Sequence, residues 1–140
     1  MKFAFGSARA SRTARQDGVL VAKRVLVVED NELNLKLFCD LLRAHGYETR
    51  PVRDSREAMR EATDFAPDLI VTDIQLPHVT GLELIESFRQ DQSLSQVPIM
   101  AVTAYAGLGD EERIRTAGAN AYVSKPISVM RFLETVQSLA

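Results

Sequence analysis

The chain has 140 residues, of which 46% are hydrophobic and 26% charged, and its formal net charge is −2. This length fits one domain with its own core, and the composition is typical of a soluble globular protein. The small negative charge excludes a general affinity for nucleic acid, and no apolar run approaches the roughly 20 residues of a membrane-spanning helix. Cys39 is the only cysteine, which excludes an intrachain disulfide and suits a reducing cytoplasm.

Residues 1–22 form a basic segment without helical or strand periodicity. Its charged residues are Lys2, Arg9, Arg12 and Arg15 against Asp17. This segment therefore carries +3, and the remaining residues carry −5. We expect a flexible, solvated N-terminal tail, followed by one domain over residues 23–140. A transit peptide has a similar composition and is the alternative interpretation of the tail.

From residue 23 onward, apolar strands alternate with amphipathic helices. Strands are predicted at residues 24–28, 47–52, 68–73, 97–104 and 121–125. Helices are predicted at residues 31–46, 54–65, 80–91, 109–119 and 128–139. Five βα units with continuously apolar strands indicate an α/β fold, a five-stranded parallel sheet with helices on both faces. Pro51 favours an edge position for the second strand, and the strongly apolar third strand is expected near the centre.

The first strand and helix add two expectations. The apolar residues at helical spacing in the first helix are Leu33, Leu37, Phe38, Leu41 and Leu42. They predict the buried face of that helix. The connection before it, VEDNEL, offers acids where a dinucleotide-binding fold would have glycines, so a nucleotide site of that type is not expected.

Polar residues follow four of the predicted strands at their carboxyl ends. Glu29 and Asp30 follow the first strand, Asp73 ends the third, Thr103 lies in the last part of the fourth and Lys125 ends the fifth. The carboxyl ends of parallel strands meet at one edge of a sheet, so these side chains should gather there. Three carboxylates in one small pocket repel one another unless a cation is present. Ligands that are all oxygen favour a hard ion, above all Mg²⁺.

Taken alone, each of these residues has an ordinary structural interpretation. Asp73, Glu29 or Asp30 could cap the helix that follows its strand. Lys125 would be a surface lysine, and Thr103 would be a β-branched strand residue. Their combination at one sheet edge is what favours a functional site.

Four segments in order, VEDN, DLIVTDIQLPHVTGLEL, AVTAYA and AYVSKPIS, resemble the receiver domain of bacterial two-component response regulators. The resemblance covers about residues 23–140 and implies a flavodoxin-like (βα)₅ fold of the CheY type. The segments VEDNELN, DIQLP, GDEERIR and YVSKPISV further resemble a group of single-domain cell-division regulators within that family. The resemblance therefore implies phosphorelay signalling in the cytoplasm, in control of the cell cycle.

The resemblance assigns phosphoryl chemistry to the acids. It implies that Asp73 accepts a phosphoryl group from a phosphohistidine of a sensor histidine kinase or a phosphotransfer protein. Asp30, Asp73 and the backbone carbonyl of Gln75 would bind Mg²⁺, and Glu29 would hold the ion through water. The protein would be a phosphoacceptor that catalyses its own phosphorylation and slow dephosphorylation, and not a conventional enzyme.

The resemblance also assigns roles to the residues around the acids. Lys125 would pair with Asp73, and a cis peptide bond to Pro126 would aim the lysine. Thr103 would donate its hydroxyl to the phosphoryl group and act as a switch with Tyr122, which would otherwise be a core aromatic residue. The resemblance implies that Gln75 and Tyr105 flank the approach of the hydrolytic water and tune the phosphoryl lifetime.

Three functions compete at this stage. The first is a stand-alone receiver switched by phosphorylation, and the second is a receiver-fold adaptor that binds partners without phosphorylation. The third is a phosphoaspartate-type hydrolase, which would require a second acid where this chain has Gln75. We expect output through contacts with a protein, made by the fourth helix, the fifth strand and the fifth helix, because no DNA-binding helix-turn-helix pattern is present.

Overall fold

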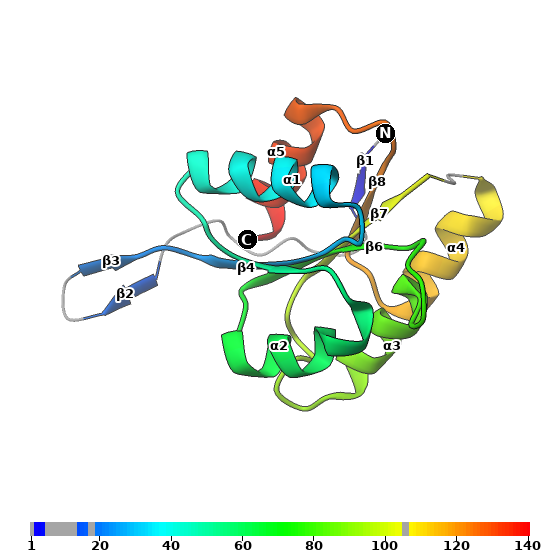
Figure 1. The fold of residues 1–140 in the computed structure, drawn as a ribbon, viewed down its shortest axis with the longest axis horizontal. Helices are drawn as coiled ribbons and strands as arrows, with labels where there is room; N and C mark the ends of the chain where they lie inside the picture. Colours follow the sequence, from blue (N-terminus) through cyan, green and yellow to red (C-terminus); the bar gives the residue numbers. More distant parts are fainter. Residues whose placement is uncertain (1, 5–13, 17–18, 105–106) are drawn as a thin grey trace.

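A computed structural model describes residues 2–4, 14–16, 19–104 and 107–140. Its main sheet has the strand order β1-β8-β7-β6-β4-β5 (Figure 1). The five parallel strands are β4 (Arg24–Val28), β5 (Glu48–Val52), β6 (Leu69–Asp73), β7 (Ile99–Thr103) and β8 (Ala121–Ser124). They confirm the predicted parallel α/β fold. As predicted, β6 lies inside the sheet, and β5, which contains Pro51, lies at its edge.

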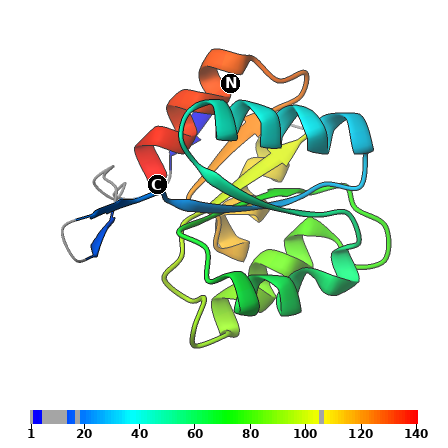
Figure 2. The same cartoon turned by 60° about the vertical axis from the view of Figure 1, so that its left-hand side comes forward.

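Helices cover both faces of this sheet. They are α1 (Glu32–Ala44), α2 (Ala58–Phe65), α3 (Gly81–Gln90), α4 (Leu108–Ala117) and α5 (Val129–Leu139), and a short 3₁₀ turn, η1 (Ser55–Glu57), precedes α2. Figure 2 shows α1 and α5 on one face and α2 and α3 on the other. Two buried apolar layers match this division, one including Phe38 of α1 and Phe132 of α5, and the other including Phe88 of α3 and Ile114 of α4.

Side-chain caps fix where three of the helices begin. The side chain of Asn31 accepts a hydrogen bond from the Asn34 N–H at the start of α1, and Ser128 does the same for the Arg131 N–H at the start of α5. Thr80 and Glu83 form a reciprocal capping box at the start of α3. The residue that caps α1 is therefore Asn31, which leaves Glu29 and Asp30 available for other contacts.

The buried face of α1 agrees only in part with the one that the sequence predicted, since Phe38 and Leu42 are buried as expected. The side chains that face the sheet are Leu35, Phe38, Cys39 and Leu42, whereas Leu33 is 79% exposed and Leu37 is also exposed. Apolar residues occur around much of this helix, so spacing alone did not select the buried stripe. Packing selects it, because the Phe38 and Phe132 rings stack with their centroids 5.0 Å apart.

The segment expected to be a tail contains three short strands. Strand β1 (Lys2–Ala4) pairs antiparallel with β8, and β2 (Ala14–Gln16) pairs with β3 (Val19–Val21) as a separate antiparallel ladder. Three-residue strands give no alternation that a sequence pattern could reveal. Within the described ranges, no helix is long and apolar enough to cross a membrane.

Candidate functional site

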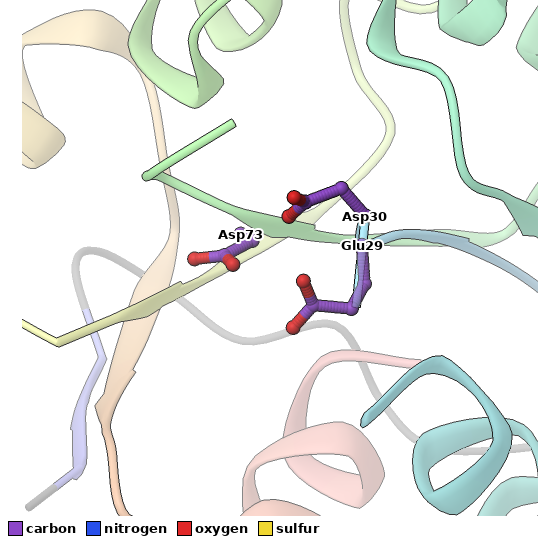
Figure 3. A group of neighbouring side chains, drawn as sticks. All are labelled: Glu29, Asp30 and Asp73. Atoms are coloured by element: carbon purple, nitrogen blue, oxygen red, sulfur yellow. The ribbon is translucent and has the colours of Figure 1, made fainter. Parts of the chain in front are cut away.

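Three carboxylates lie together at the carboxyl ends of β4 and β6. Glu29 and Asp30 follow β4 directly, and Asp73 is the last residue of β6. One carboxylate oxygen from each lies within 4.8 Å of the others. Figure 3 shows the three side chains gathered around one small region. Glu29 and Asp73 are buried, whereas Asp30 is exposed, so the cluster opens to solvent on the side of Asp30.

Lys125 is the cation of this cluster. Its Nζ lies 2.9 Å from Oδ2 of Asp73 and 3.4 Å from Oε1 of Glu29. The backbone N–H of Lys125 donates to the Thr103 carbonyl at 2.7 Å, which fixes the residue beside the end of β7. Burial opposes the lysine charge, but the hydrogen bond to Asp73 and the attraction of both acids outweigh burial and raise the pKa of Lys125. The lysine is thus held in its charged form.

The surroundings of Glu29 disfavour its charged form. Burial, followed by repulsion from Asp73, raises the pKa of Glu29 to about 7 from the ordinary value of 4.5. The Asn31 N–H donates to Oε2 of Glu29 at 3.2 Å, and this contact opposes the rise only in part. One cation, Lys125, therefore does not offset the two buried acids, and the cluster favours a further positive charge.

Backbone packing holds Asp73 at the buried side of this cluster. All five residues of β6 are buried, and Asp73 is only 3% exposed. Its Oδ1 accepts a hydrogen bond of 3.3 Å from the Gln75 N–H. Gly81, the first residue of α3, packs so closely that a Cβ atom there would lie 2.2 Å from the carbonyl oxygen of Asp73. Sequence reasoning placed Gly81 at the start of a helix but missed this approach.

The side chain of Gln75 connects the loop after β6 with the end of β7. Its Nε2 donates to Oγ1 of Thr103 at 3.2 Å, and its Oε1 accepts from the Ala104 N–H at 3.1 Å. Thr103 is buried, and so is Tyr122 of β8, which packs in the apolar layer on the α2 and α3 face. Thr103 and Gln75 therefore lie in one hydrogen-bonded group beside the acids.

A buried serine supports the loop between β6 and α3. Oγ of Ser55 donates to the Pro77 carbonyl at 2.7 Å and accepts from the Val79 N–H at 3.2 Å. These contacts flank His78, which has a positive φ of 70°. Sequence reasoning missed Ser55, because nothing in its own neighbourhood indicates a contact with residues more than 20 positions away.

The remaining predicted residues are placed as follows. The peptide bond between Lys125 and Pro126 is cis. Tyr105, expected to flank the approach of the hydrolytic water, lies outside the described residues. Glu29, Asp30, Asp73, Thr103 and Lys125 all occupy the carboxyl edge of the parallel sheet, as expected from their places at strand ends.

The donor set fits a hard divalent cation. The three acids offer oxygen atoms at a spacing that one ion could bridge, and an ion there would offset the repulsion that raises the pKa of Glu29. A divalent ion held by these acids, with Lys125 alongside, would supply the positive charge that stabilises negative charge developing on an incoming group.

Comparison with curated proteins gives close relatives over most of the chain. The chain is 55% identical over 118 residues to the polar-differentiation response regulator DivK of Brucella ovis, an alignment that spans 84% of this chain and 96% of the relative. It is 56% identical over 116 residues to DivK of Brucella anthropi, spanning 83% and 94%. The narrower resemblance seen in the sequence is therefore confirmed as a similarity to DivK.

Solved structures agree with the fold. The chemotaxis protein CheY4 of Vibrio cholerae superposes with a TM-score of 0.82 at 26% identity, over 86% of this chain and all of that one. The receiver domain of a sensor histidine kinase from Pseudomonas aeruginosa, a structure with a magnesium ion coordinated in its active-site cleft, gives 0.76 at 33% identity, over 84% and 96%. The response regulator receiver domain model matches residues 25–137, and the chain thus belongs to the receiver domain family of response regulators.

Proposed function

We propose that this protein accepts a phosphoryl group on Asp73 and signals through phosphorylation-dependent contacts with other proteins. The observation that carries the proposal is the Asp73 carboxylate itself. It is 3% exposed, 2.9 Å from the Lys125 ammonium and within one cluster with Glu29 and Asp30. A structural helix cap would need neither a lysine partner nor two further acids.

The donor in this proposal is a phosphohistidine on a sensor histidine kinase or a phosphotransfer protein. A carboxylate oxygen of Asp73 attacks the phosphorus, the P–N bond breaks, and its electron pair stays with the imidazole. Asp30, Asp73 and the Gln75 carbonyl would hold Mg²⁺, with Glu29 reached through water, and the ion would neutralise charge on the transferring group. Lys125, which pairs with Asp73 at rest, is within reach of a phosphoryl oxygen on the same residue.

Two relations to DivK support a role in cell division. The chain is 55% identical to a protein named for polar differentiation, and it covers 96% of that protein. In this role, output depends on α4, β8 and α5, and β8 pairs with β7, the strand that ends in Thr103. A receiver-fold adaptor that ignores phosphorylation is the competing function.

The test is phosphorylation by a small donor. Incubation with acetyl phosphate and Mg²⁺ should add one phosphoryl group, located at Asp73 by mass spectrometry after reduction with borohydride. Asp73→Asn should remove the modification, because an amide is not a nucleophile, whereas Asp64→Asn on the exposed side of α2 should leave it intact. Equal incorporation in Asp73→Asn and the wild type would refute the assignment, and no incorporation in the wild type would favour the adaptor.

A further inference from the structure

The carboxamide of Gln75 makes hydrogen bonds to two groups at the end of β7. Nε2 of Gln75 donates to the Thr103 hydroxyl at 3.2 Å, and Oε1 accepts from the Ala104 N–H at 3.1 Å. The planar carboxamide thus binds the Thr103 side chain and the backbone of the next residue at the same time. A loop residue that is otherwise exposed to solvent makes both contacts, so they order its side chain.

These two groups lie beside the Asp73 carboxylate. Strands β6 and β7 are neighbours, with Asp73 in register with Val102, the residue before Thr103. The Ile74 N–H also donates to the Val102 carbonyl at 2.9 Å, which carries the pairing one residue past Asp73. A phosphoryl group on Asp73 would therefore bring its oxygens, which are strong acceptors, to the side of the site where Thr103 and Ala104 lie.

In the unmodified protein the Ala104 N–H already donates a hydrogen bond to Gln75. Oε1 of Gln75 is a neutral oxygen held where a charged oxygen would bind more strongly, because hydrogen bonds to ionised acceptors are about twice as strong as neutral ones. The Thr103 hydroxyl is engaged by the same carboxamide. The resting contacts are thus of the kind that a phosphoryl group can displace.

We infer that Gln75 is a latch of the resting state. Its carboxamide holds Thr103 and Ala104 while Asp73 is unmodified, and it must leave both groups before phosphoryl oxygens can take them. This inference rests on the proposed phosphorylation of Asp73. It gives Gln75 a role in setting how readily the protein switches, in addition to any effect on the attacking water.

A cavity next to the latch can receive the displaced side chain. It measures about 70 Å³ and lies between the loop after β6 and helices α3 and α4, and Gln75 and Thr103 both line it. Asp110 and Arg113 of α4, which form an ion pair with each other, also line the cavity, and the second carboxylate oxygen and the other guanidinium N–H groups can bind a carboxamide. Release of the latch can therefore transmit the change at Asp73 to α4.

The experiment compares wild type with Gln75→Met, which keeps the length of the side chain and removes both hydrogen bonds. The matched control is Gln92→Met, at an exposed turn after α3. Two quantities are measured: hydrogen exchange of the Ala104 amide in the unmodified protein, and the dissociation constant of beryllium trifluoride, a phosphoryl mimic, in the presence of Mg²⁺. Gln75→Met should speed the amide exchange and tighten beryllium trifluoride binding roughly five- to tenfold, the worth of about one hydrogen bond.

Each of the two measurements can overturn the inference about Gln75. Unchanged exchange at Ala104 would show that the latch does not form in solution, and faster exchange with unchanged or weaker binding would show that it does not compete with the phosphoryl group. Either result overturns the inference, and structural damage alone would weaken binding, not tighten it. Failure of the wild type to bind the mimic would instead count against the proposed function, and the amide exchange would still report separately on the resting contacts.

Discussion

Two acids that follow neighbouring strands of the sheet have opposite electrostatic surroundings. Glu29 follows β4, is 1% exposed and has a pKa raised to about 7 by burial and by Asp73. Asp54 lies just past β5 on the surface, and its pKa is lowered to about 2, mainly by hydrogen bonds from the side chain and backbone of Arg56. The ends of these strands are linked, because the Glu29 N–H donates to the Val52 carbonyl at 3.1 Å.

The difference separates an acid that supports the fold from one that opposes it. Asp54 caps η1, and its charged form is the favoured one in the folded state. Glu29 is more easily protonated in the folded chain than in the unfolded chain, so its charged form works against folding. Acids retained in such a position are typical of functional sites, where a ligand or a substrate compensates the cost.

The largest expected effect is that of Lys125→Ala. Removing the cation leaves Glu29 and Asp73 buried together, and breaking a buried ion pair from one side costs roughly 3 kcal/mol. We expect a loss of about this size in the unfolding free energy from urea titrations at pH 8 without Mg²⁺. Lys36→Ala, which removes an exposed ion pair on α1, is the control and should cost less than about 1 kcal/mol. Equal losses in the two variants would contradict the buried pairing.

Glu29→Gln should act in the opposite direction. The folded pKa of Glu29 lies above the unfolded value, so the stability it contributes is complete below pH 4.5 and is lost as pH rises through about 7. Replacing the acid by an amide should therefore stabilise the metal-free protein by about 2 to 3 kcal/mol at pH 8 and have little effect at pH 4.5. Thermal unfolding with EDTA across this range measures the difference. A gain of the same size at pH 4.5 would point to a cause other than the charge.

Asp30→Asn should have a smaller effect on stability and a clear effect on Mg²⁺. Asp30 is exposed, so the repulsion it adds to the cluster is partly screened by solvent. We expect a modest rise in melting temperature without Mg²⁺ and a weaker response to Mg²⁺ in a titration followed by thermal shift. Exposed Asp40→Asn on α1 serves as the control. An unchanged Mg²⁺ affinity would exclude Asp30 as a ligand.

Asp54→Asn should have the smallest effect of the four variants, a modest loss of stability that is fully expressed near neutral pH, because solvent screens the ion pair of Asp54 with Arg56. Because its folded pKa lies below the ordinary value of 3.8, the stability from Asp54 is present above pH 3.8 and is lost as pH falls toward about 2. The variant should lose part of the acid-side decline in stability and keep the decline toward alkaline pH that Glu29 causes. Urea unfolding at several pH values between 2 and 8 measures this pH dependence of the unfolding free energy. A changed decline toward alkaline pH would mean that Asp54 and Glu29 are energetically coupled.

Most residues of the candidate site could be predicted from the sequence, because they lie at the ends of predicted strands. The acids and Lys125 could be placed together because each follows a continuous apolar run, and parallel strands deliver their carboxyl ends to one edge. The cap of α3 follows from Thr80, which has a residue type that N-caps prefer, whereas the sequence offered Glu29 and Asp30 as caps of α1 and the structure has Asn31. These features depend on local chemistry, which a sequence displays directly.

What the sequence could not display depends on packing between distant segments. Leu33 and Leu35 are both apolar, and only the packing of α1 in the apolar layer that it shares with the sheet and α5 decides which of them is buried. The hydroxyl of Ser55 and the missing side chain of Gly81 matter because of the loop and the carbonyl they meet, 22 and 8 residues away. The contacts of Gln75 with Thr103 and Ala104 span two strands and likewise leave no local pattern.

The antiparallel strand β1 has a practical consequence for work with the purified protein. One end of the main sheet is β5, where Pro51 lacks the N–H that a pairing chain would need, and the other end of the parallel set is β8, which β1 covers. A protease that removed the first few residues would convert β8 into an open edge, a template for pairing with another molecule. Preparations should therefore be checked for an intact β1 segment before their tendency to aggregate is interpreted.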